Sequence, residues 1–297
     1  MKWVDIMDHF SKEMWARVFL MAKKEYKQLF RNRWIVVISG LFMILTVLVS
    51  HYGTISGDSR EWNDLENTVR YLTAYIEYMV PIFALILGYG SVVRERERGT
   101  MELILSYPLD RGEVIAGKFL GLWGVLCTCV IAGLGLGGFV ISRQVENVVW
   151  SEFYLFILAA VLLGGVYISI TMLLSIIFDS SNYAMSGSIF VLFLFSFIWL
   201  FSMVALAELT FGWKQVEAGN PPRWYFGIQF FNPVLIWYTL LALNIPALRE
   251  WAMEFGGEEP GYHPEYYDTW IMIALLLVWI AVPLLVGEYI FKRQEGG

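Results

Sequence analysis

Long apolar stretches separated by short polar stretches dominate the pattern of this chain. Six of them are long enough to cross a bilayer, because a membrane-spanning helix needs about 20 apolar residues. These stretches lie near residues 34–52, 72–93, 114–141, 153–178, 184–207 and 269–291. Their apolar residues do not follow the alternating pattern of outer-membrane strands, so the sequence predicts an all-α polytopic membrane protein with six transmembrane helices.

Composition supports a membrane protein. Hydrophobic residues make up 58% of the 297 positions and charged residues only 16%, whereas about a quarter of an ordinary soluble domain is charged. We therefore expect a multi-pass protein of the cell membrane. The net charge of −6 says little about partners, and no nucleic acid is expected among them.

Positive charges are distributed unevenly between the two sets of predicted loops. Residues 1–33, 94–118, 178–183 and 292–297 together hold 15 of the 21 Lys and Arg, and the other loops hold six. Cytoplasmic loops of membrane proteins are enriched in Lys and Arg. The sequence therefore predicts that both termini and the segment 94–113 lie in the cytoplasm.

The first 33 residues form a separate amphipathic region before the first span. Its apolar side chains recur at helical spacing and are Phe10, Met14, Val18, Phe19, Ala22, Tyr26, Leu29 and Phe30. We expect a cytoplasmic elbow helix that lies against the lipid headgroups, which makes membrane lipids partners. The alternative is a solvated helix packed on protein.

The segment 94–113 is the one part of the chain that looks suited to contact something outside the membrane. Thr100 can cap a short helix with Met101, Ile104 and Leu105 on its apolar side. Pro108 is expected to end this helix. Asp110 and Glu113 then form an aspartate variant of the capping box, which starts the next long helix. A short rod held between two spans can transmit force.

The outer region 208–268 contains a further apolar stretch at 224–248. This stretch is interrupted at Asn232-Pro233 and again at Asn244-Ile245-Pro246. Two interruptions favour a re-entrant or interfacial hairpin, with a seventh crossing as the alternative. The rest of the region is rich in acidic and aromatic residues, which predict a lid at the outer headgroups: Trp213, Trp251, Glu258, Glu259, Tyr262, Tyr266 and Tyr267.

Candidate chemistry is sparse, so the chain is not expected to be an enzyme or to bind a metal or cofactor. His9, His51 and His263 are too dispersed for a zinc site. Residues 112–119 reproduce the glycine and lysine spacing of a phosphate-binding loop, but Phe119 stands where Ser or Thr should bind magnesium. Cys127 and Cys129 are interpreted as packing residues.

Intramembrane positions supply one candidate for the translocation path. Glu77 lies within the second span, on a face shared with Tyr78 and near Tyr71 and Tyr75, where it can line a polar cavity. Pairing with an outer-loop Arg, or contact with headgroups, is the structural alternative. Pairs of glycines one turn apart predict close helix packing, expected within one chain, with packing between two chains as the alternative: Gly117 with Gly121, and Gly133 with Gly137.

The segment after the second span resembles the cytoplasmic motif of ABC-2-type transporter permeases, including the NosY-like and multidrug-type members. The matching residues are Glu95, Arg98-Gly99-Thr100-Met101-Glu102, Ser106-Tyr107-Pro108, Arg111, Glu113 and Gly117-Lys118. The six-span layout, the amphipathic N-terminal helix and the broken outer hairpin with Phe231-Asn232-Pro233 extend the resemblance over nearly the whole chain.

The resemblance implies a permease that moves substrate by alternating access, driven by a separate ABC ATPase. ATP and Mg would then bind to that partner, and none would bind to this chain. Six spans imply a second permease chain, expected to form a homodimer. The residues implied to dock the ATPase are Arg98, Gly99, Thr100, Met101, Glu102, Ile104, Leu105, Pro108 and Arg111. A secondary transporter or channel without an ATPase, and an integral-membrane enzyme, remain as alternatives.

Overall fold

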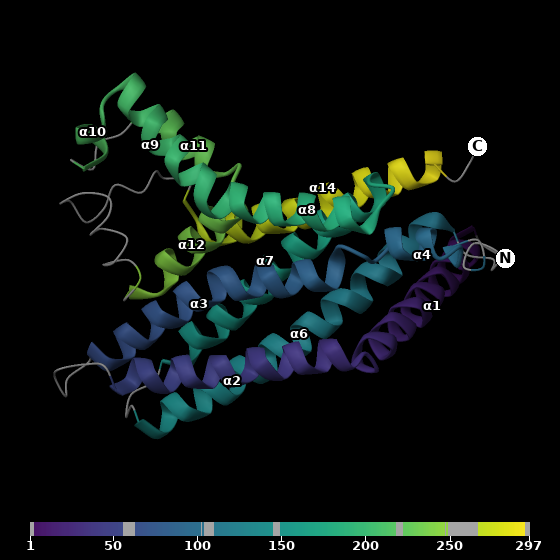
Figure 1. The fold of residues 1–297 in the computed structure, drawn as a ribbon, viewed down its shortest axis with the longest axis horizontal. Coiled ribbons are helices and arrows are strands. Elements are labelled where there is room, and N and C mark those ends of the chain that lie inside the picture. The colour runs from purple at the N-terminus through teal and green to yellow at the C-terminus, as the bar shows by residue number, and fades with distance from the viewer. Residues whose placement is uncertain are drawn as a thin grey trace.

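A computed structural model describes residues 3–55, 63–101, 103, 110–144, 149–217, 222–246, 248 and 267–294, with side chains of the first helix described from Glu13 onward. Within these ranges every regular element is a helix. The first helix, α1 (Trp3–Phe30), turns through Arg31 and Asn32 into the first span. The start of α1, the short helix α4 (Val93–Glu97) and the end of the last helix, α14, lie at the same end of the molecule (Figure 1).

Six helical segments of the described residues are long and apolar enough to cross a membrane. They are α2 (Arg33–Ile55), α3 (Asn63–Gly88), α6 (Arg111–Gln144), α7 (Trp150–Ile177), the run α8 (Ser181–Phe193), η1 (Leu194–Ile198) and α9 (Trp199–Thr210), and α14 (Thr269–Gln294). The predicted six-span, all-α membrane fold is therefore confirmed at this level.

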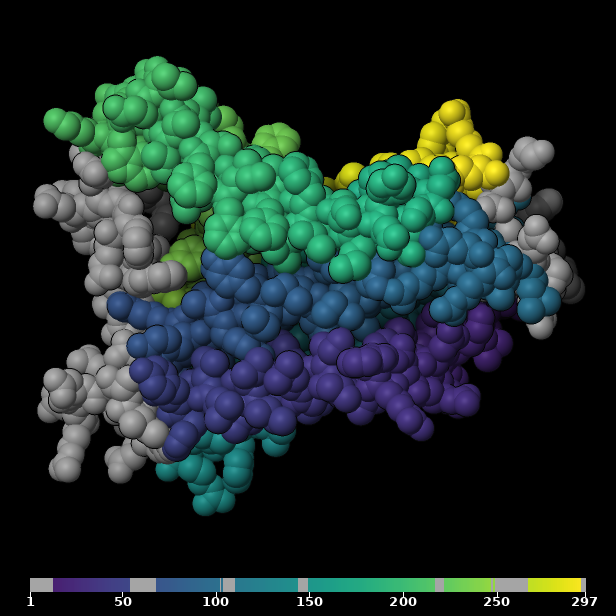
Figure 2. Space-filling view, in the orientation of Figure 1, coloured from purple at the N-terminus to yellow at the C-terminus, as the bar shows by residue number. Residues whose placement is uncertain are grey.

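Helix α7 is the centre of the bundle, and the fifth span is its outermost member. In the most apolar window of α7, 72% of the residues are buried, compared with 17% in the span made by α8, η1 and α9. Helices α3, α6, α12 (Pro233–Asn244) and α14 all contact α7. Figure 2 shows α8 and η1 lying along the outside of one face, next to α3.

Helix α1 packs in parallel along the first turns of α6. Two glycines of α6 allow this approach: a Cβ at Gly117 would lie 2.6 Å from the Cβ of Met21, and one at Gly121 would lie 2.9 Å from the carbonyl oxygen of Ala22. Farther along α6, Gly133 and Gly137 face α2 in the same way. The prediction that these glycines pack helices within one chain is confirmed, with α1 as an additional partner.

The predicted apolar side of the N-terminal helix is only partly correct. Val18 and Ala22 are buried against α6, but Met14 and Phe19 are exposed, and the side chain of Phe10 lies outside the described residues. Met21 and Glu25 are buried instead. Trp15, Phe19 and Leu20 form a second, exposed apolar side. The helix thus packs on protein, as the alternative expected, and still offers apolar residues outward.

The fifth span contains a π-helix that the sequence did not predict. It is η1, and it lies where α8 bends into α9 (Figure 1). A π-turn holds one residue more than an α-turn and commonly accompanies a bend. Beyond it, α9 forms a small apolar cluster with α10 (Trp213–Glu217) and α11 (Arg223–Gln229).

The outer apolar stretch breaks at the predicted Asn232-Pro233. Helices α11 and α12 meet there at an angle of 110°, so they do not form one straight crossing. Asn232 caps α12, since its Oδ1 accepts hydrogen bonds from the backbone N–H groups of Val234 at 2.8 Å and Leu235 at 3.4 Å. The second predicted interruption is also present, because α12 ends at Asn244.

The predicted outer lid can be followed only in part. Trp213 contributes to the apolar cluster of α9, α10 and α11, and Tyr267 packs against the rings of Phe226 and Phe230. The remaining members lie outside the described residues: Trp251, Glu258, Glu259, Tyr262 and Tyr266.

Candidate functional site

The segment that connects α3 to α6 begins with α4 and a tight turn. Helix α4 ends in a Schellman motif, in which the N–H of Thr100 bonds to the carbonyl of Glu95 at 3.0 Å and the N–H of Gly99 bonds to that of Arg96 at 3.1 Å. Gly99 has a φ of +67°, which favours glycine. The hydroxyl of Thr100 also donates to the Glu95 carbonyl at 3.2 Å. Met101 and Leu103 are helical, which places Thr100 directly before the predicted short helix.

One set of bonds fixes this segment to the junction of α7 and α8. The hydroxyl oxygen of Ser175 accepts hydrogen bonds from the N–H groups of Val92 and Val93, both at 3.0 Å. The carboxylate of Glu97 accepts one from the N–H of Ser181 at 2.7 Å. The start of α4 is therefore held by the fourth span, and its end is held by the first residue of the fifth.

A second set of bonds reaches the last turn of α14. Arg96 donates to Oε1 of Gln294 at 2.9 Å and to the carbonyl of Ile176 at 3.3 Å. Arg111 donates to the carbonyl of Lys292 at 2.7 Å. Arg111, which was expected to face a partner, and Arg96 thus bind within the chain and join the segment to the sixth span.

The third attachment joins α1 to the start of α6. The guanidinium of Arg17 donates three hydrogen bonds to the carboxylate of Glu113, the shortest at 2.7 Å. These bonds raise the pKa of Arg17. Glu113 also accepts from the N–H of Asp110 at 3.0 Å, which confirms that half of the predicted capping box. Sequence reasoning missed Arg17 because its partner is 96 residues away.

The outward side of the segment is smaller than the motif suggested. Arg94 and Arg98 are exposed, and Leu103 is 64% exposed. Met101, expected as an apolar docking contact, is 3% exposed and belongs to the main core, so its side chain anchors the segment. The other docking residues, Glu102, Ile104, Leu105 and Pro108, lie outside the described residues.

Glu77 lies partly buried on α3. The adjacent Tyr78 stacks on Phe197 of η1 with ring centroids 6.0 Å apart, and the hydroxyls of Tyr167 and Tyr238 lie within electrostatic range of the carboxylate. Among the described residues, neither a hydrogen bond nor an ion pair holds this carboxylate. The tyrosines near Glu77 therefore come from α7 and α12, in addition to Tyr78 of its own helix.

Tyr71 and Tyr75, expected near Glu77, face another helix. Tyr75 donates a hydrogen bond to the carbonyl of Phe42 on α2 at 2.9 Å, and Tyr71 packs edge-on against Tyr52. Two residues along a helix, side chains point about 200° apart. The expected grouping of Glu77 with Tyr75 is therefore wrong.

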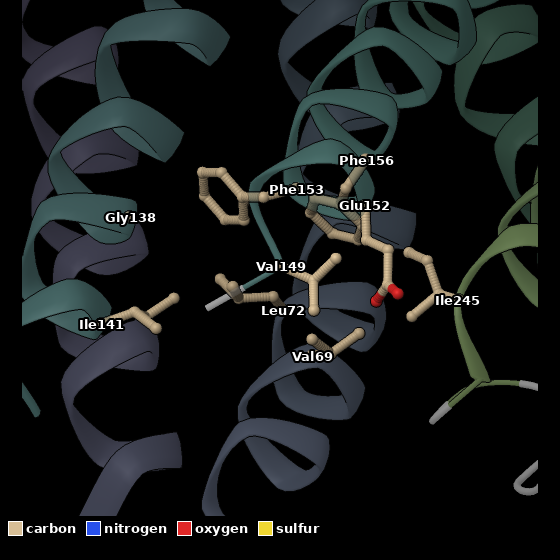
Figure 3. Close-up of a pocket in the computed structure, with 9 residues that line it drawn as sticks. All are labelled: Val69, Leu72, Gly138, Ile141, Val149, Glu152, Phe153, Phe156 and Ile245. Atoms are coloured by element: carbon tan, nitrogen blue, oxygen red, sulfur yellow. The ribbon is translucent and has the colours of Figure 1, made fainter. Parts of the chain in front are cut away.

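A separate apolar pocket lies near the start of α7 and holds about 480 Å³ of empty space, part of it open to solvent. Figure 3 shows Glu152 as its one charged side chain, with the carboxylate between Val149 and Ile245. Sequence analysis did not single out Glu152. A carboxylate in the first turn of a helix interacts favourably with the helix dipole, which accounts for its position without a ligand.

The phosphate-loop spacing at residues 112–119 lies entirely within helix α6. A phosphate-binding loop is instead a turn between a strand and a helix. Lys118, whose position corresponds to the phosphate-binding lysine, is 1% exposed and bonded to carboxylates. Within the described part of the chain, no three His, Cys, Asp or Glu residues are arranged to bind a metal ion.

Comparison with known proteins identifies the family of the chain. The model of a family described as ABC-2 family transporter protein matches residues 19–295. A probable ABC transporter permease protein NosY from Stutzerimonas stutzeri is 31% identical over 286 residues, which cover 94% of this chain and 99% of that protein. A protein of the same name from Pseudomonas aeruginosa is 31% identical over 289 residues, covering 93% and 98%.

These matches assign the chain to the transmembrane part of a transporter. Permease subunits of ABC transporters are not enzymes, and a separate subunit hydrolyses ATP. The six apolar helices agree with a multi-pass protein of the cell membrane. The chain belongs to the ABC-2 family of transporter proteins.

Proposed function

We propose that this chain is a permease whose alternating access is driven by a separate ABC ATPase that docks on residues 94–113. Both termini and this segment would lie in the cytoplasm, and two copies of the chain would form the working permease. ATP and Mg would bind to the ATPase.

One observation carries this proposal: the connecting segment is attached to several helices and still offers an outward side. Its bonds reach the junction of α7 and α8 through Ser175 and Ser181, and the end of α14 through Gln294. Arg94, Arg98 and Leu103 remain exposed. A displacement applied to this outward side is therefore passed to the fourth, fifth and sixth spans, because packed elements move as units.

The exposed arginines favour a partner that presents acidic groups around an apolar contact. Complementary charges raise the rate of encounter and fix the orientation of docking. We assign the apolar contact to Ile104 and Leu105, with Leu103 added because its side chain is exposed in the described part of the segment.

Glu77 is the proposed contact of this permease with its substrate. An ionisable side chain within a membrane span that has no paired charge is a candidate for a transport pathway. Its neighbours are the rings and hydroxyls of Tyr78, Tyr167 and Tyr238. Such a carboxylate would bind a positively charged or hydrogen-bond-donating part of the substrate.

The docking assignment is tested by isolating the tagged permease from its native membrane and identifying accompanying subunits by mass spectrometry. The wild-type chain should bring with it an ATPase that carries a complete phosphate-binding loop. A variant with Ile104→Asp and Leu105→Asp should insert into the membrane but lose this partner, because two carboxylates cannot enter an apolar groove without a large desolvation cost.

The matched control is the double variant Phe19→Asp with Leu20→Asp, which places the same two charges on exposed apolar positions of α1 at the same end of the molecule. It should keep the ATPase. Unchanged association in the variant with Ile104→Asp and Leu105→Asp would contradict the docking assignment. Substrate transport by the permease alone in liposomes would instead support a secondary transporter or channel.

A further inference from the structure

Lys118 joins three separate parts of the chain at one buried point. Its Nζ lies 3.1 Å from Oε1 of Glu25 on α1 and 2.7 Å from Oε2 of Glu95 on α4. The same ammonium group donates to the carbonyl of Ser91 at 3.0 Å. Lys118 is 1% exposed and Glu25 is 7% exposed. A lysine this buried is rare unless it is paired. All three of its partners lie outside α6, the helix that carries Lys118.

The α1 side of this junction is in register with α6. Arg17, Met21 and Glu25 recur every four residues on α1, as do Glu113, Gly117 and Gly121 on α6. Arg17 binds Glu113, Met21 lies over Gly117, and Glu25 lies over Gly121. Residues four apart share one face of a helix. Lys118 lies next to this face and binds Glu25. Helix α1 therefore cannot slide along α6 without breaking both the close contacts at the glycines and this ion pair.

The other side of the junction fixes the Gly99-Thr100 turn within the docking segment 94–113. Lys118 binds the side chain of Glu95, and the main-chain carbonyl of Glu95 accepts both hydrogen bonds from Thr100. The position of the Gly99-Thr100 turn is therefore fixed by the residue that Lys118 holds. A break at Lys118 would release this turn from α6 and from α1 together.

The charges show why the lysine cannot be replaced by an apolar residue of similar size. Glu25 and Glu95 are two carboxylates held around one cation, and Arg17 is already committed to Glu113. Without Lys118, the two carboxylates would repel each other at a site with little access to water. Removing one partner of a buried ion pair costs far more than the pair contributes when intact.

We propose that Lys118 is a positioning residue that makes α1, α4 and the start of α6 move as one body. The elbow helix would then follow the docking segment when the ATPase acts, so that α1 becomes part of the moving unit. This inference rests on the proposed function for its consequence during transport, although the geometry that it describes belongs to the permease alone.

The test measures a distance across the junction in full-length permease in lipid nanodiscs. Spin labels are placed at Lys23→Cys on α1 and Arg98→Cys after α4, both exposed positions, with the two native cysteines replaced by Cys127→Ser and Cys129→Ala. The wild-type junction should give one narrow distance distribution. Lys118→Met should broaden it to about twice the width. Lys27→Met, which removes one exposed positive charge from α1, should leave it unchanged.

A charge exchange separates positioning from general stability. The triple exchange Lys118→Glu with Glu25→Lys and Glu95→Lys keeps opposite charges at both contacts and should restore the narrow distribution. If Lys118→Met does not accumulate in the membrane, recovery of both accumulation and the narrow distance by the exchange supports the proposal. A narrow distance in Lys118→Met, or a folded exchange variant that stays broad, overturns it.

The same proteins without spin labels are then combined with the ATPase. Lys118→Met should lower permease-dependent stimulation of ATP hydrolysis by about tenfold, within the usual range of coupling between sites, and the exchange should recover it. Full stimulation in Lys118→Met would overturn the role in coupling. If no ATPase accompanies the permease, the proposed function fails, whereas the distance measurement still decides whether Lys118 holds the junction.

Discussion

The side-chain amide of Asn232 donates a hydrogen bond to the main-chain carbonyl of Phe195 at 2.8 Å. Phe195 lies in the π-helix η1 of the fifth span, and Asn232 lies at the break between α11 and α12. The Oδ1 of the same side chain caps α12. One residue that is 1% exposed therefore connects the outer bent helix pair to the irregular part of a membrane span.

Replacing Asn232 should weaken this connection in two separable ways. Asn232→Ala loses the cap and the bond to Phe195, and together these are worth about 2 kcal/mol of stability. Asn232→Asp keeps an oxygen for the cap but directs a second oxygen at the Phe195 carbonyl, so it should be at least as destabilising. Thermal unfolding in detergent measures both, with Ser202→Ala, an exposed hydroxyl in α9, as the control. Unfolding temperatures equal to wild type would contradict the assigned role.

The glycines of α6 should differ sharply in their tolerance of alanine. A Cβ at Gly121 would lie 2.5 Å from the Cβ of Glu25, whereas one at Gly135 meets no atom within 4 Å. Gly121→Ala should push α1 away at a cost of about 1–3 kcal/mol, and Gly135→Ala should cost nothing. Disulfide cross-linking between cysteines introduced at Met21 on α1 and Val114 on α6, which pack together, in a cysteine-free background, reports whether the helices remain docked. Equal cross-linking in the two variants would argue against close packing at Gly121.

The ion pair between Arg17 and Glu113 should stabilise the docking of α1 on α6 more than the exposed pair between Arg17 and Glu13 does. Glu113→Gln removes the charge that binds Arg17 and should speed cleavage of α1, although the Arg17 side chain is 35% exposed and partly screened by solvent. Glu13→Gln alters an exposed contact 4.0 Å from Arg17 and should have little effect. Limited proteolysis of α1 in nanodiscs distinguishes the two. Faster cleavage in Glu13→Gln than in Glu113→Gln would refute the ranking.

Glu77→Gln should lower substrate-stimulated ATP hydrolysis by about tenfold, because the neutral amide loses the charge while keeping nearly the same volume. Glu152→Gln, in the separate pocket at the start of α7, is the matched control and should remain near wild type. Association with the ATPase should be unaffected by either change. Unaltered transport and stimulated hydrolysis in Glu77→Gln would remove Glu77 from the translocation path.

Local features of the chain were predictable where the deciding interactions are also local. The six spans follow from hydrophobicity summed over about 20 residues. The start of α6 follows from Asp110 and Glu113, three positions apart, and the outer break follows from Asn232-Pro233. Each of these depends on neighbours within one or two helical turns, so the order of residues contains the needed information.

The roles of the charged residues in the connecting segment were not predictable in this way. Arg111 had the same apparent role as Arg98, yet it binds the carbonyl of Lys292, which is 181 positions away. Met101 followed the apolar spacing of a docking helix, but the core had room for its side chain. The burial of Lys118 likewise depends on Glu25 and Glu95 converging from two other helices.

The sequence by itself determined that this chain crosses a membrane and carries the ABC-2 motif, because hydrophobicity and short motifs can be read from the order of residues alone. Only the tertiary structure decided which side chains of the connecting segment face outward and which bind the bundle. The physical reason is that an arginine or a methionine gains similar free energy from an internal partner or an external one. The choice depends on which partner the packed helices bring within about 3 Å.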